Sequence, residues 1–392
     1  MNDSEPSEII VEIEKCVHGG DGLARHEGKT YFVSGGVPGD IVSLHSVTRK
    51  KRSFFAQIER VIEPSSDRRD PPCQYYLKCG GCNWQHMTHE AQLKHKALIF
   101  KDTLRFLGGI NDDIQVENIS GEEWNYRHRA QFKIEGDSVG FYGRKSHEVV
   151  DINSCPVLTA DINESLQALK EASLSEAQQI KIFSNEKGEL ASEPTIHDLT
   201  QEKVCTEING VRMMVSGGGF FQQNRELTPQ LGKWVAQTLK GEYAIDLYGG
   251  SGFFSWMIHE QVKEVLLVEK EPRLVSLAEE TMKLNGIKNV KPHCMTAEKF
   301  FSSQQFKKIK SDGTLIVDPP RGGLHKTILP RLAKLKCARI IYVSCDPATQ
   351  ARDIKVLSAS GNFILSRAAL FDLYPNTNHM ESVVVLDHRP KL

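Results

Sequence analysis

The stretch IIYVSCDPATQARD, residues 340–353, decides the fold of this 392-residue chain. Its first four residues are apolar and predict a short buried strand. A helix is expected from about Ala348, because Pro347 suits the first helical position. Cys345 therefore falls at the carboxyl end of a strand, where open α/β sheets bind their ligands. The nearby helix N-terminus would favour its thiolate, although a small buried cysteine is the commoner explanation for one such residue.

Around this stretch, the C-terminal part of the chain alternates strand-like and helical segments. Strands are expected at 243–248, 264–269, 315–318, 339–344, 363–370 and 382–387. The clearest helix, at 272–284, is closed by Asn285-Gly286. This alternation predicts a doubly wound α/β sheet.

The N-terminal part has a different pattern. Short strands alternate with glycine-rich turns from residue 9 to about 62, which is typical of a small β-barrel. The strands expected there are 9–13, 29–33, 41–47 and 56–62. A proline-containing linker follows at 64–72, then a helix at 88–109 that Thr88 can cap. Residues 124–151 again predict β structure.

Composition limits the class of protein. Hydrophobic residues make up 40% and charged residues 25%, as in soluble globular proteins. No apolar run approaches the roughly 18 residues of a membrane span, and the N-terminus lacks a signal-peptide pattern, so we expect a cytoplasmic protein with no membrane partner. The net charge of −1 counts against indiscriminate nucleic-acid binding. Basic runs at 49–52 and 307–310 could still bind RNA, or simply form solvated faces.

Nine cysteines occur, and an odd number without a signal peptide argues against a disulfide framework. Cys73, Cys79 and Cys82 lie close together around a Gly80-Gly81 turn. A structural zinc site usually has two C-x2-C pairs, and only one is present. Three close thiols and a distant fourth suit a [4Fe-4S] cluster. Cys155 is the best fourth candidate, and spacing alone leaves zinc open.

A candidate cofactor pocket is indicated by DLYGGSG, residues 246–252, which follows a strand and opens a helix. Its glycines let the backbone approach a ligand closely, although a simple tight loop would have the same residues. Glu269 ends the next strand, where an acid can accept both ribose hydroxyls. Ser255 replaces the third glycine of the dinucleotide motif, so S-adenosylmethionine fits better than a pyrophosphate.

Four segments together resemble the RNA uracil-5-methyltransferase family. They are the stretch around Cys345, DPPRGG at 318–323, DLYGGSG at 246–252 and the cysteine-rich loop at 73–82. The resemblance covers nearly the whole chain. SCDPATQARD differs from the family's usual SCNPATLARD mainly at Asp346, whose negative charge should oppose thiolate formation unless it points away.

The resemblance implies three domains. Residues 1–64 resemble the TRAM domain, an OB-like β-barrel that binds RNA. Residues 65–218 would form a small α+β central domain that binds RNA and an iron–sulfur cluster, with helix 88–109 packed on the catalytic domain. Residues 219–392 would form a Rossmann-like domain that uses S-adenosylmethionine. The cysteines match the iron–sulfur branch of the family at all four positions, which favours the cluster over zinc.

The chemistry that the family performs needs one activated cysteine and one positioned carboxylate. Uracil C5 is a poor nucleophile, so a thiolate must first add to C6. A base must then remove the C5 proton so that the thiolate can leave. The resemblance assigns the addition to Cys345 and the proton removal to Glu381, which lies in NHME at 378–381.

Further residues are assigned to the cofactor by the same resemblance. Phe253 replaces a smaller or polar residue, and Thr296 stands where Asp or Asn is common. Asp318 can also hold the uracil edge, and the Gln of an FxQxN segment lies at 220–224. The cofactor contacts implied are Gln222, Tyr248, Gly250, Glu269, Thr296 and Asp318.

The RNA substrate is less narrowly defined. DPPRGG lacks the cysteine that RNA cytosine-5-methyltransferases carry after their prolines, which favours uracil. We expect a monomer that acts on 23S rRNA, with transfer RNA as the alternative. A non-catalytic RNA-binding protein with a degenerate methyltransferase fold is the competing hypothesis. Intact Cys345, Glu381 and Asp318 speak against it.

Overall fold

The structure is a computed structural model that describes residues 8–111, 114–171, 178–307 and 312–389. The basic run expected at 307–310 falls outside this description beyond its first residue. The chain divides into two compact units. Unit 1 contains the residues up to Ile99 together with Tyr142–His147 and Tyr374–Asn378, and unit 2 contains the remainder.

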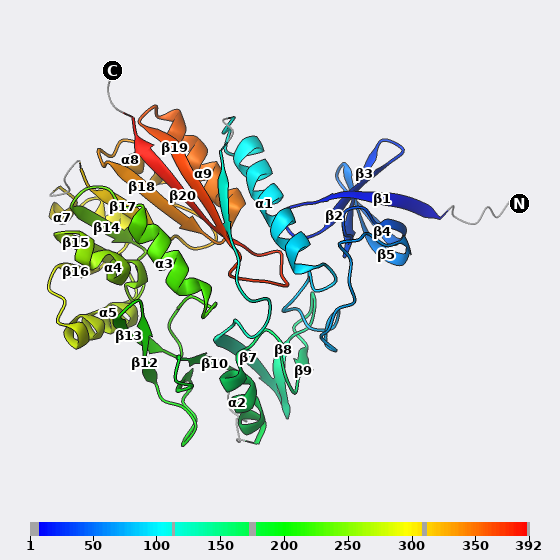
Figure 1. The fold of residues 1–392 in the computed structure, drawn as a ribbon, viewed down its shortest axis with the longest axis horizontal. Helices are drawn as coiled ribbons and strands as arrows, with labels where there is room; N and C mark the ends of the chain where they lie inside the picture. The colour runs from blue at the N-terminus through cyan, green and yellow to red at the C-terminus, as the bar shows by residue number, and fades with distance from the viewer. Residues whose placement is uncertain (1–7, 112–113, 172–177, 308–311, 390–392) are drawn as a thin grey trace, which may run out of the picture. The chain divides into compact units, whose positions relative to one another are not determined.

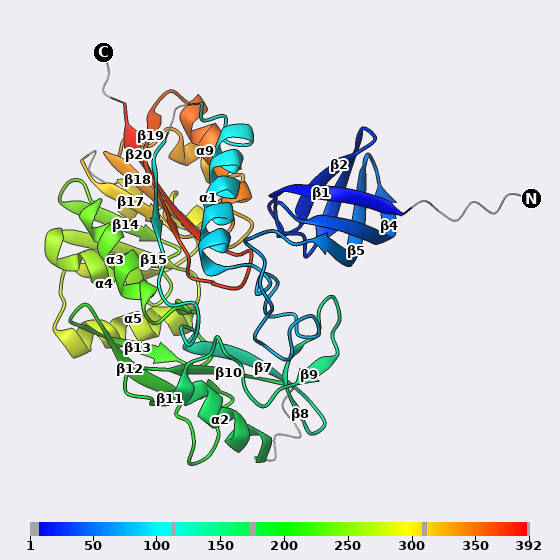
Figure 2. The same ribbon diagram turned by 45° about the vertical axis from the view of Figure 1, so that its right-hand side comes forward.

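Unit 1 begins with the predicted β-barrel, which is closed in the order β1-β2-β3-β5-β4 (Figure 2). Its strands are β1 (Ile9–Cys16), β2 (Gly22–His26), β3 (Lys29–Ser34), β4 (Ile41–Lys50) and β5 (Ser53–Glu63). Alternate residues such as Val11, Ile13 and Val33 fill the interior, as the two-residue period of a strand requires. β2 was not predicted, because GLARH has few apolar residues and follows a glycine-rich turn.

Unit 1 also includes residues from far along the chain. The loop 374–378 binds residues 83–96 by several hydrogen bonds. Asn376 N donates to Gln92 Oε1 at 2.6 Å, and Trp84 N donates to Asn376 O at 3.0 Å. Asn83 Nδ2 donates to Asn378 Oδ1 at 2.7 Å. These bonds make a distant loop an integral part of the N-terminal unit.

The helix predicted at 88–109 is α1 (His89–Phe106), and the boundary between the units falls inside it. Thr88 Oγ1 accepts a hydrogen bond from Ala91 N at 3.4 Å, as expected of a cap. Phe100 and Leu104 are buried, whereas Leu107 lies beyond the helix and is exposed.

Unit 2 is built on an eight-stranded sheet in the order β16-β15-β14-β17-β18-β20-β19-β6 (Figure 1). The strands are β6 (Val116–Ile119), β14 (Tyr243–Leu247), β15 (Glu264–Glu269), β16 (Val290–Cys294), β17 (Thr314–Val317), β18 (Arg339–Ser344), β19 (Phe363–Phe371) and β20 (Glu381–His388). All neighbouring pairs are parallel except those that β20 makes with β18 and β19. All six predicted strands are present. β16 and β6 were not predicted.

Helices connect these strands. They are α3 (Leu227–Gln237), α4 (Phe253–Ile258), α5 (Pro272–Asn285), α6 (Ala297–Phe300), α7 (Gln304–Lys307), α8 (Leu329–Leu332) and α9 (Pro347–Ala359), with a 3-10 turn at His259–Gln261. The strand order runs outward in both directions from β14 and β17. Because such crossovers are right-handed, α4 and α5 cover one face and α8 and α9 the other. Ligands of open α/β sheets bind at this reversal point, beyond the carboxyl ends of the strands.

The remaining part of unit 2 is a second, smaller sheet in the order β11-β10-β7-β8-β9, with a separate hairpin. Its elements are β7 (Arg129–Glu135), β8 (Ser138–Tyr142), β9 (Val149–Asp151), α2 (Ala160–Glu171), β10 (Gln179–Ser184) and β11 (Leu190–Glu193), and the hairpin is β12 (Lys203–Ile208) with β13 (Val211–Ser216). β structure within 124–151 was predicted. Among the described helices, none has the length and apolar character needed to cross a membrane.

Candidate active site

The sheet brings the predicted catalytic residues to one edge. Cys345 and Asp318 follow the carboxyl ends of the neighbouring parallel strands β18 and β17. β20 runs in the opposite direction and begins with Glu381 at the same edge. Since Ser344 pairs with Ser382, Cys345 and Glu381 are adjacent across two paired strands. Residues that are 27 and 36 positions from Cys345 in sequence therefore meet around its thiol.

The environment of Cys345 differs from the expectation. Burial, together with the negative charges of Glu381 and Asp318, raises the pKa of its thiol to about 11. The guanidinium of Arg321 acts in the opposite direction, by its charge and by a hydrogen bond to the thiol. Any stabilisation of a thiolate by the helix N-terminus, as predicted, is thus outweighed by desolvation and by two carboxylates.

Asp346, the departure from the family motif, acts as the N-cap of α9. Its Oδ1 accepts hydrogen bonds from Ala348 N and Thr349 N, both at 3.0 Å. The carboxylate is therefore bonded to the first turn of the helix, where a negative charge is favourable.

The glycine-rich loop after β14 is closed by Glu269. Its Oε2 accepts a hydrogen bond from Gly250 N at 3.1 Å. Its Oε1 accepts hydrogen bonds from the backbone N–H groups of Lys270 and Glu271. Gly252 has φ of +91°, and a Cβ there would lie 2.6 Å from the ring of Trp256. The loop thus needs glycine both for its backbone conformation and for close packing.

Two carboxylates beneath this loop are unusually basic. Asp246 is fully buried and accepts hydrogen bonds from Ser255 N and Oγ at 3.0 and 2.7 Å. Burial nevertheless raises the pKa of Asp246 to about 6. Burial and the neighbouring Asp246 raise the pKa of Asp318 to about 7. A carboxyl group with a pKa near neutrality can donate or accept a hydrogen bond at the substrate.

Gln222 supplies an unsatisfied polar atom. The residue is 4% exposed, and its Oε1 is buried without a hydrogen-bond partner among the described residues. Its backbone O lies 3.0 Å from Nε2 of the buried His128. The adjacent Phe221 packs edge-on against Phe253, at 6.1 Å between ring centroids. Since a buried amide oxygen without a donor is costly, this atom suits a ligand that donates a hydrogen bond.

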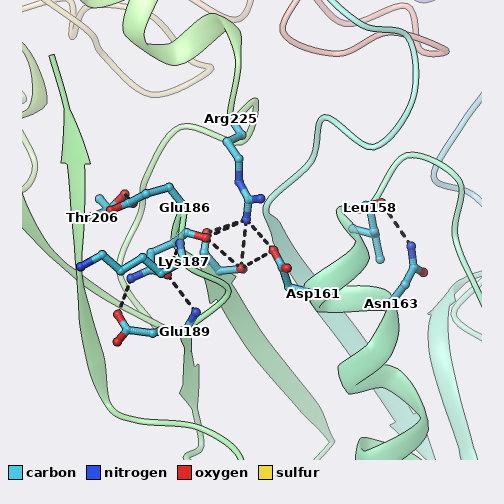
Figure 3. Close-up of polar contacts among 10 residues, drawn as sticks. Leu158, Asp161, Asn163, Glu186, Lys187, Glu189, Thr206 and Arg225 are labelled. Carbon is cyan, nitrogen blue, oxygen red and sulfur yellow. Dashed lines mark hydrogen bonds and ion pairs between the residues drawn. The ribbon is translucent and has the colours of Figure 1, made fainter.

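The segment after Gln222 is held by a network of polar contacts. Arg225 Nη2 donates to Asp161 Oδ2 at 2.7 Å and to Ser184 Oγ at 3.0 Å. Figure 3 shows the guanidinium pointing towards Asp161 at the start of α2. Asn224 Oδ1 accepts from Leu227 N at 2.9 Å and so begins α3. Both anchors fix the backbone that carries Gln222.

Thr296 follows β16 at the same edge of the sheet and is the N-cap of α6. Its Oγ1 accepts a hydrogen bond from Lys299 N at 3.3 Å. Its role towards a cofactor therefore stays a prediction.

The four cluster cysteines are divided between the units. Cys73, Cys79 and Cys82 lie in a unit 1 loop, where Gly80 N donates to Tyr142 O at 2.9 Å. Cys155 lies in unit 2, with its N–H bonded to Asn163 Oδ1 at 2.8 Å. Within the described ranges, no three His, Cys, Asp or Glu side chains are grouped so as to hold a metal ion. The arrangement thus does not itself support the predicted cluster.

Arg321 lowers the pKa of the Cys345 thiol and is the residue of this site that the sequence analysis does not predict. The motif DPPRGG indicates the identity of the base, but it predicts no role for its arginine at the thiol. A signal was present, because Arg321 follows a strand that neighbours the strand of Cys345. The motif does not show that the loop at residues 321–324 folds back onto α9.

Comparisons with known proteins agree with this geometry. Residues 197–389 match the tRNA (Uracil-5-)-methyltransferase family. An uncharacterized RNA methyltransferase of Aquifex aeolicus is 31% identical, over 97% of this chain and 98% of the relative. The 23S rRNA (uracil(1939)-C(5))-methyltransferase RlmD of Shewanella amazonensis is 29% identical, over 97% of this chain and 95% of its own.

A solved structure has the same fold. It is the Pyrococcus abyssi tRNA (uracil-54, C5)-methyltransferase in complex with S-adenosyl-L-homocysteine, with a TM-score of 0.74 and 23% identity over 96% of this chain and all of that one. Sequence relatives along the full length, a matching family model and a site with a cysteine beside a carboxylate lead to one conclusion. The chain belongs to the RNA uracil-5-methyltransferase family.

Proposed function

We propose that this protein transfers a methyl group from S-adenosylmethionine to C5 of a uridine in 23S rRNA. The observation that carries the proposal is the meeting of Cys345, Glu381 and Asp318 at one edge of the sheet, where the Arg321 guanidinium lowers the pKa of the thiol. The RlmD relative, which aligns over nearly its whole length, supports ribosomal RNA as the substrate class.

The proposed mechanism assigns one step to each group. The Cys345 thiolate adds to C6 of the uracil, and the π electrons of the C5=C6 double bond move towards C5 and O4 to give an enolate. S-adenosylmethionine would supply an electrophilic methyl group, whose bond to sulfur would break as C5 takes it, with S-adenosylhomocysteine as the leaving group. Glu381 removes the C5 proton, and the C6–sulfur bond breaks as the double bond re-forms. Asp318 holds the uracil edge, because its pKa of about 7 lets it donate a hydrogen bond near neutral pH.

Cofactor binding is proposed for the residues around the glycine-rich loop. The carboxylate of Glu269 lies at a strand end, where it suits the ribose hydroxyls. Gln222 Oε1 would accept a hydrogen bond that it lacks among the described residues. The full proposed set is Gln222, Tyr248, Gly250, Glu269, Thr296 and Asp318.

Nucleoside mass spectrometry on separated ribosomal and transfer RNA tests the function. A strain lacking this gene should lose 5-methyluridine from the large ribosomal RNA. The wild-type gene and Cys294→Ala, a change at an exposed cysteine, should restore it, whereas Cys345→Ala should not. Loss from transfer RNA would overturn the substrate and keep the chemistry.

No change in either RNA pool would contradict the proposed activity. Calorimetry with S-adenosylmethionine then separates the remaining hypotheses. Binding of the cofactor would leave an enzyme with another substrate, and its absence would favour the non-catalytic RNA-binding protein.

We also propose that Cys73, Cys79, Cys82 and Cys155 hold a [4Fe-4S] cluster. The support comes from the sequence, which has four thiol donors at the positions of the family's iron–sulfur branch, three of them between residues 73 and 82. Protein purified without oxygen should contain iron and acid-labile sulfide in equal amounts, and Cys79→Ser should lose both. Stoichiometric zinc without sulfide would contradict the cluster.

A further inference from the structure

Helix α9 binds the loop that carries Arg321. The helix begins two residues after Cys345, and side chains from its first two turns reach the backbone of residues 321–324. Thr349 Oγ1 donates to Arg321 O at 3.1 Å and also lies 3.2 Å from Asp346 O. Arg352 Nη2 donates to Gly322 O at 3.0 Å. Two consecutive carbonyl groups of the loop are thus held by one helix.

A buried carboxylate completes this attachment. Asp353 is fully buried, and its Oδ2 accepts from Leu324 N at 2.7 Å and from the Tyr342 hydroxyl at 2.8 Å. Arg352 Nε donates to Asp353 Oδ1 at 2.9 Å, so the two side chains support each other. A Cβ at Gly323, where φ is +75°, would lie 2.7 Å from Asp353 Oδ2 and 2.6 Å from the Arg352 guanidinium. Glycine therefore permits the close approach.

This attachment matters for the nucleophile because Arg321 is an exposed residue with a long side chain. A flexible arginine loses considerable conformational entropy when its guanidinium is held at one point. The backbone of Arg321 must therefore be held in place if its guanidinium is to stay near the thiol. The backbone of Arg321 is fixed by the same helix that begins beside Cys345.

We propose that Thr349 and Arg352 are positioning residues, which hold the 321–324 loop and so fix the backbone of Arg321 at the strand end next to that of Cys345. The inference rests on the proposed function for its purpose, but not for its test. A residue with only a structural role would change the stability of the fold, and it would leave the reactivity of Cys345 unchanged in the protein that stays folded.

Alkylation of Cys345 by iodoacetamide measures this effect without RNA or cofactor. The rate is followed on the Cys345 peptide by mass spectrometry, at a fixed pH below 10. Thr349→Val keeps the shape of the side chain and removes the donor. We expect it and Arg352→Gln to slow alkylation by roughly 2- to 10-fold, the effect of one lost hydrogen bond. Thr349→Ser should retain the wild-type rate, as should Lys355→Ala at an exposed position of the same helix.

A double-mutant cycle separates positioning from general disturbance. If Thr349 acts through Arg321, Thr349→Val should cause no further slowing in an Arg321→Ala background. Equal slowing in both backgrounds, or an unchanged rate in the single variant, would overturn the proposal. Thermal unfolding of each variant confirms that the folded protein is being compared. Because no methyl transfer is measured, a failure here is distinct from a failure of the proposed function.

Discussion

At the scale of single residues, the balance of charge around Cys345 determines the state of the nucleophile. Two carboxylates and burial favour the thiol, and one guanidinium favours the thiolate. With a pKa of about 11, the ligand-free enzyme keeps its cysteine protonated and poorly reactive at neutral pH. The proton must be lost as the uracil binds, which restricts a reactive thiolate to the productive complex.

Substitution of Glu381 by Gln should therefore have two opposite effects. Removing its negative charge lowers the pKa of Cys345, and each unit of decrease gives roughly tenfold more thiolate below the pKa. Alkylation of Cys345 in the ligand-free protein should become faster. Turnover should stop, because the C5 proton is no longer removed, and a covalent RNA–protein adduct should accumulate on denaturing gels.

A double variant provides the control for adduct formation. Cys345→Ala combined with Glu381→Gln should form no adduct under the same conditions. Slower alkylation in Glu381→Gln, or full turnover, would contradict the roles assigned to these residues.

The buried Asp246 predicts how stability depends on pH. Its pKa of about 6 in the folded protein exceeds the ordinary value of 3.8, so its ionisation costs about 3 kcal/mol of unfolding free energy above pH 7. The protein is therefore most stable with Asp246 protonated, below about pH 4, and the free energy of unfolding falls as the pH rises through 6. Asp246→Asn should remove this loss, because the amide oxygen can still accept both bonds from Ser255.

Urea unfolding of the ligand-free protein at pH 5 and pH 8 measures the effect. Asp246→Asn should exceed the wild type by more at pH 8 than at pH 5. Asp137→Asn, at an exposed position in a hairpin turn, should follow the wild type at both values. A variant that is equally destabilised at the two pH values would show that the carboxylate contributes stability in its ionised form.

At the scale of secondary-structure elements, α9 connects the nucleophile to the rest of the site. Gln350, in its first turn, donates to Tyr342 O at 2.9 Å, and its Oε1 lies 2.9 Å from Ser382 Oγ. The helix thus contacts β18 and β20, the strands that carry Cys345 and Glu381. Its N-terminal cap therefore matters for more than helix stability.

Substitution of Asp346, the N-cap of α9, should change the stability of the protein. Asp346→Ala removes the acceptor for two backbone N–H groups and should destabilise the protein by about 1 kcal/mol in urea unfolding. Asp346→Asn should be close to neutral, because asparagine is an equally good cap. A loss in Asp346→Asn as large as in Asp346→Ala would show that the charge, and not the cap bond, is what stabilises the helix.

The elements that sequence predicted are those with a continuous apolar pattern. β18 and β15 have the predicted boundaries, and α5 ends at the predicted asparagine. β16, VKPHC, contains one proline and polar residues because it is an edge strand, and edge strands carry weak hydrophobic patterns. β6 joins the sheet through β19, about 250 residues away, and no local pattern encodes such a pairing.

At the scale of the whole molecule, the β-barrel carries aromatic and basic side chains that we predict to bind RNA. Phe32 and Phe55 stack at 5.2 Å between ring centroids, and Lys50 Nζ lies 5.2 Å from the Phe55 ring. Both rings are partly exposed, and aromatic rings beside cations bind unpaired bases. We predict that Lys50→Ala and Phe55→Ala weaken RNA binding several-fold in filter-binding or anisotropy assays.

The salt dependence of RNA binding distinguishes the contribution of Lys50 from that of Phe55. Lys50→Ala should reduce the slope of log affinity against log salt by about one if it contacts a phosphate, whereas Phe55→Ala should leave the slope unchanged. Arg60→Ala is the matched control, because Glu8 already pairs with Arg60 at 3.0 Å. Equal weakening in Arg60→Ala would indicate a diffuse charge effect instead of a defined surface.

The candidate site was predictable to different depths. Cys345, Glu381 and Asp318 were named from motifs, and the strand order explains why they meet. The protonation of the thiol was not predictable, because it depends on burial and on neighbours from two other strands, β17 and β20. The contact of Arg321 with the thiol was missed for the same reason, since it depends on how a loop folds back onto α9.

The loop 374–378 has a consequence for synthesis of the protein on the ribosome. Unit 1 is otherwise built from residues before 148, yet this loop supplies partners for Gln92, Trp84 and Asn83. Those partners do not exist until residue 378 of 392 has been translated. The N-terminal unit therefore cannot reach its final hydrogen-bonded state before residue 378 has been made, and a nascent chain halted before that point carries an incomplete first unit together with an incomplete catalytic sheet.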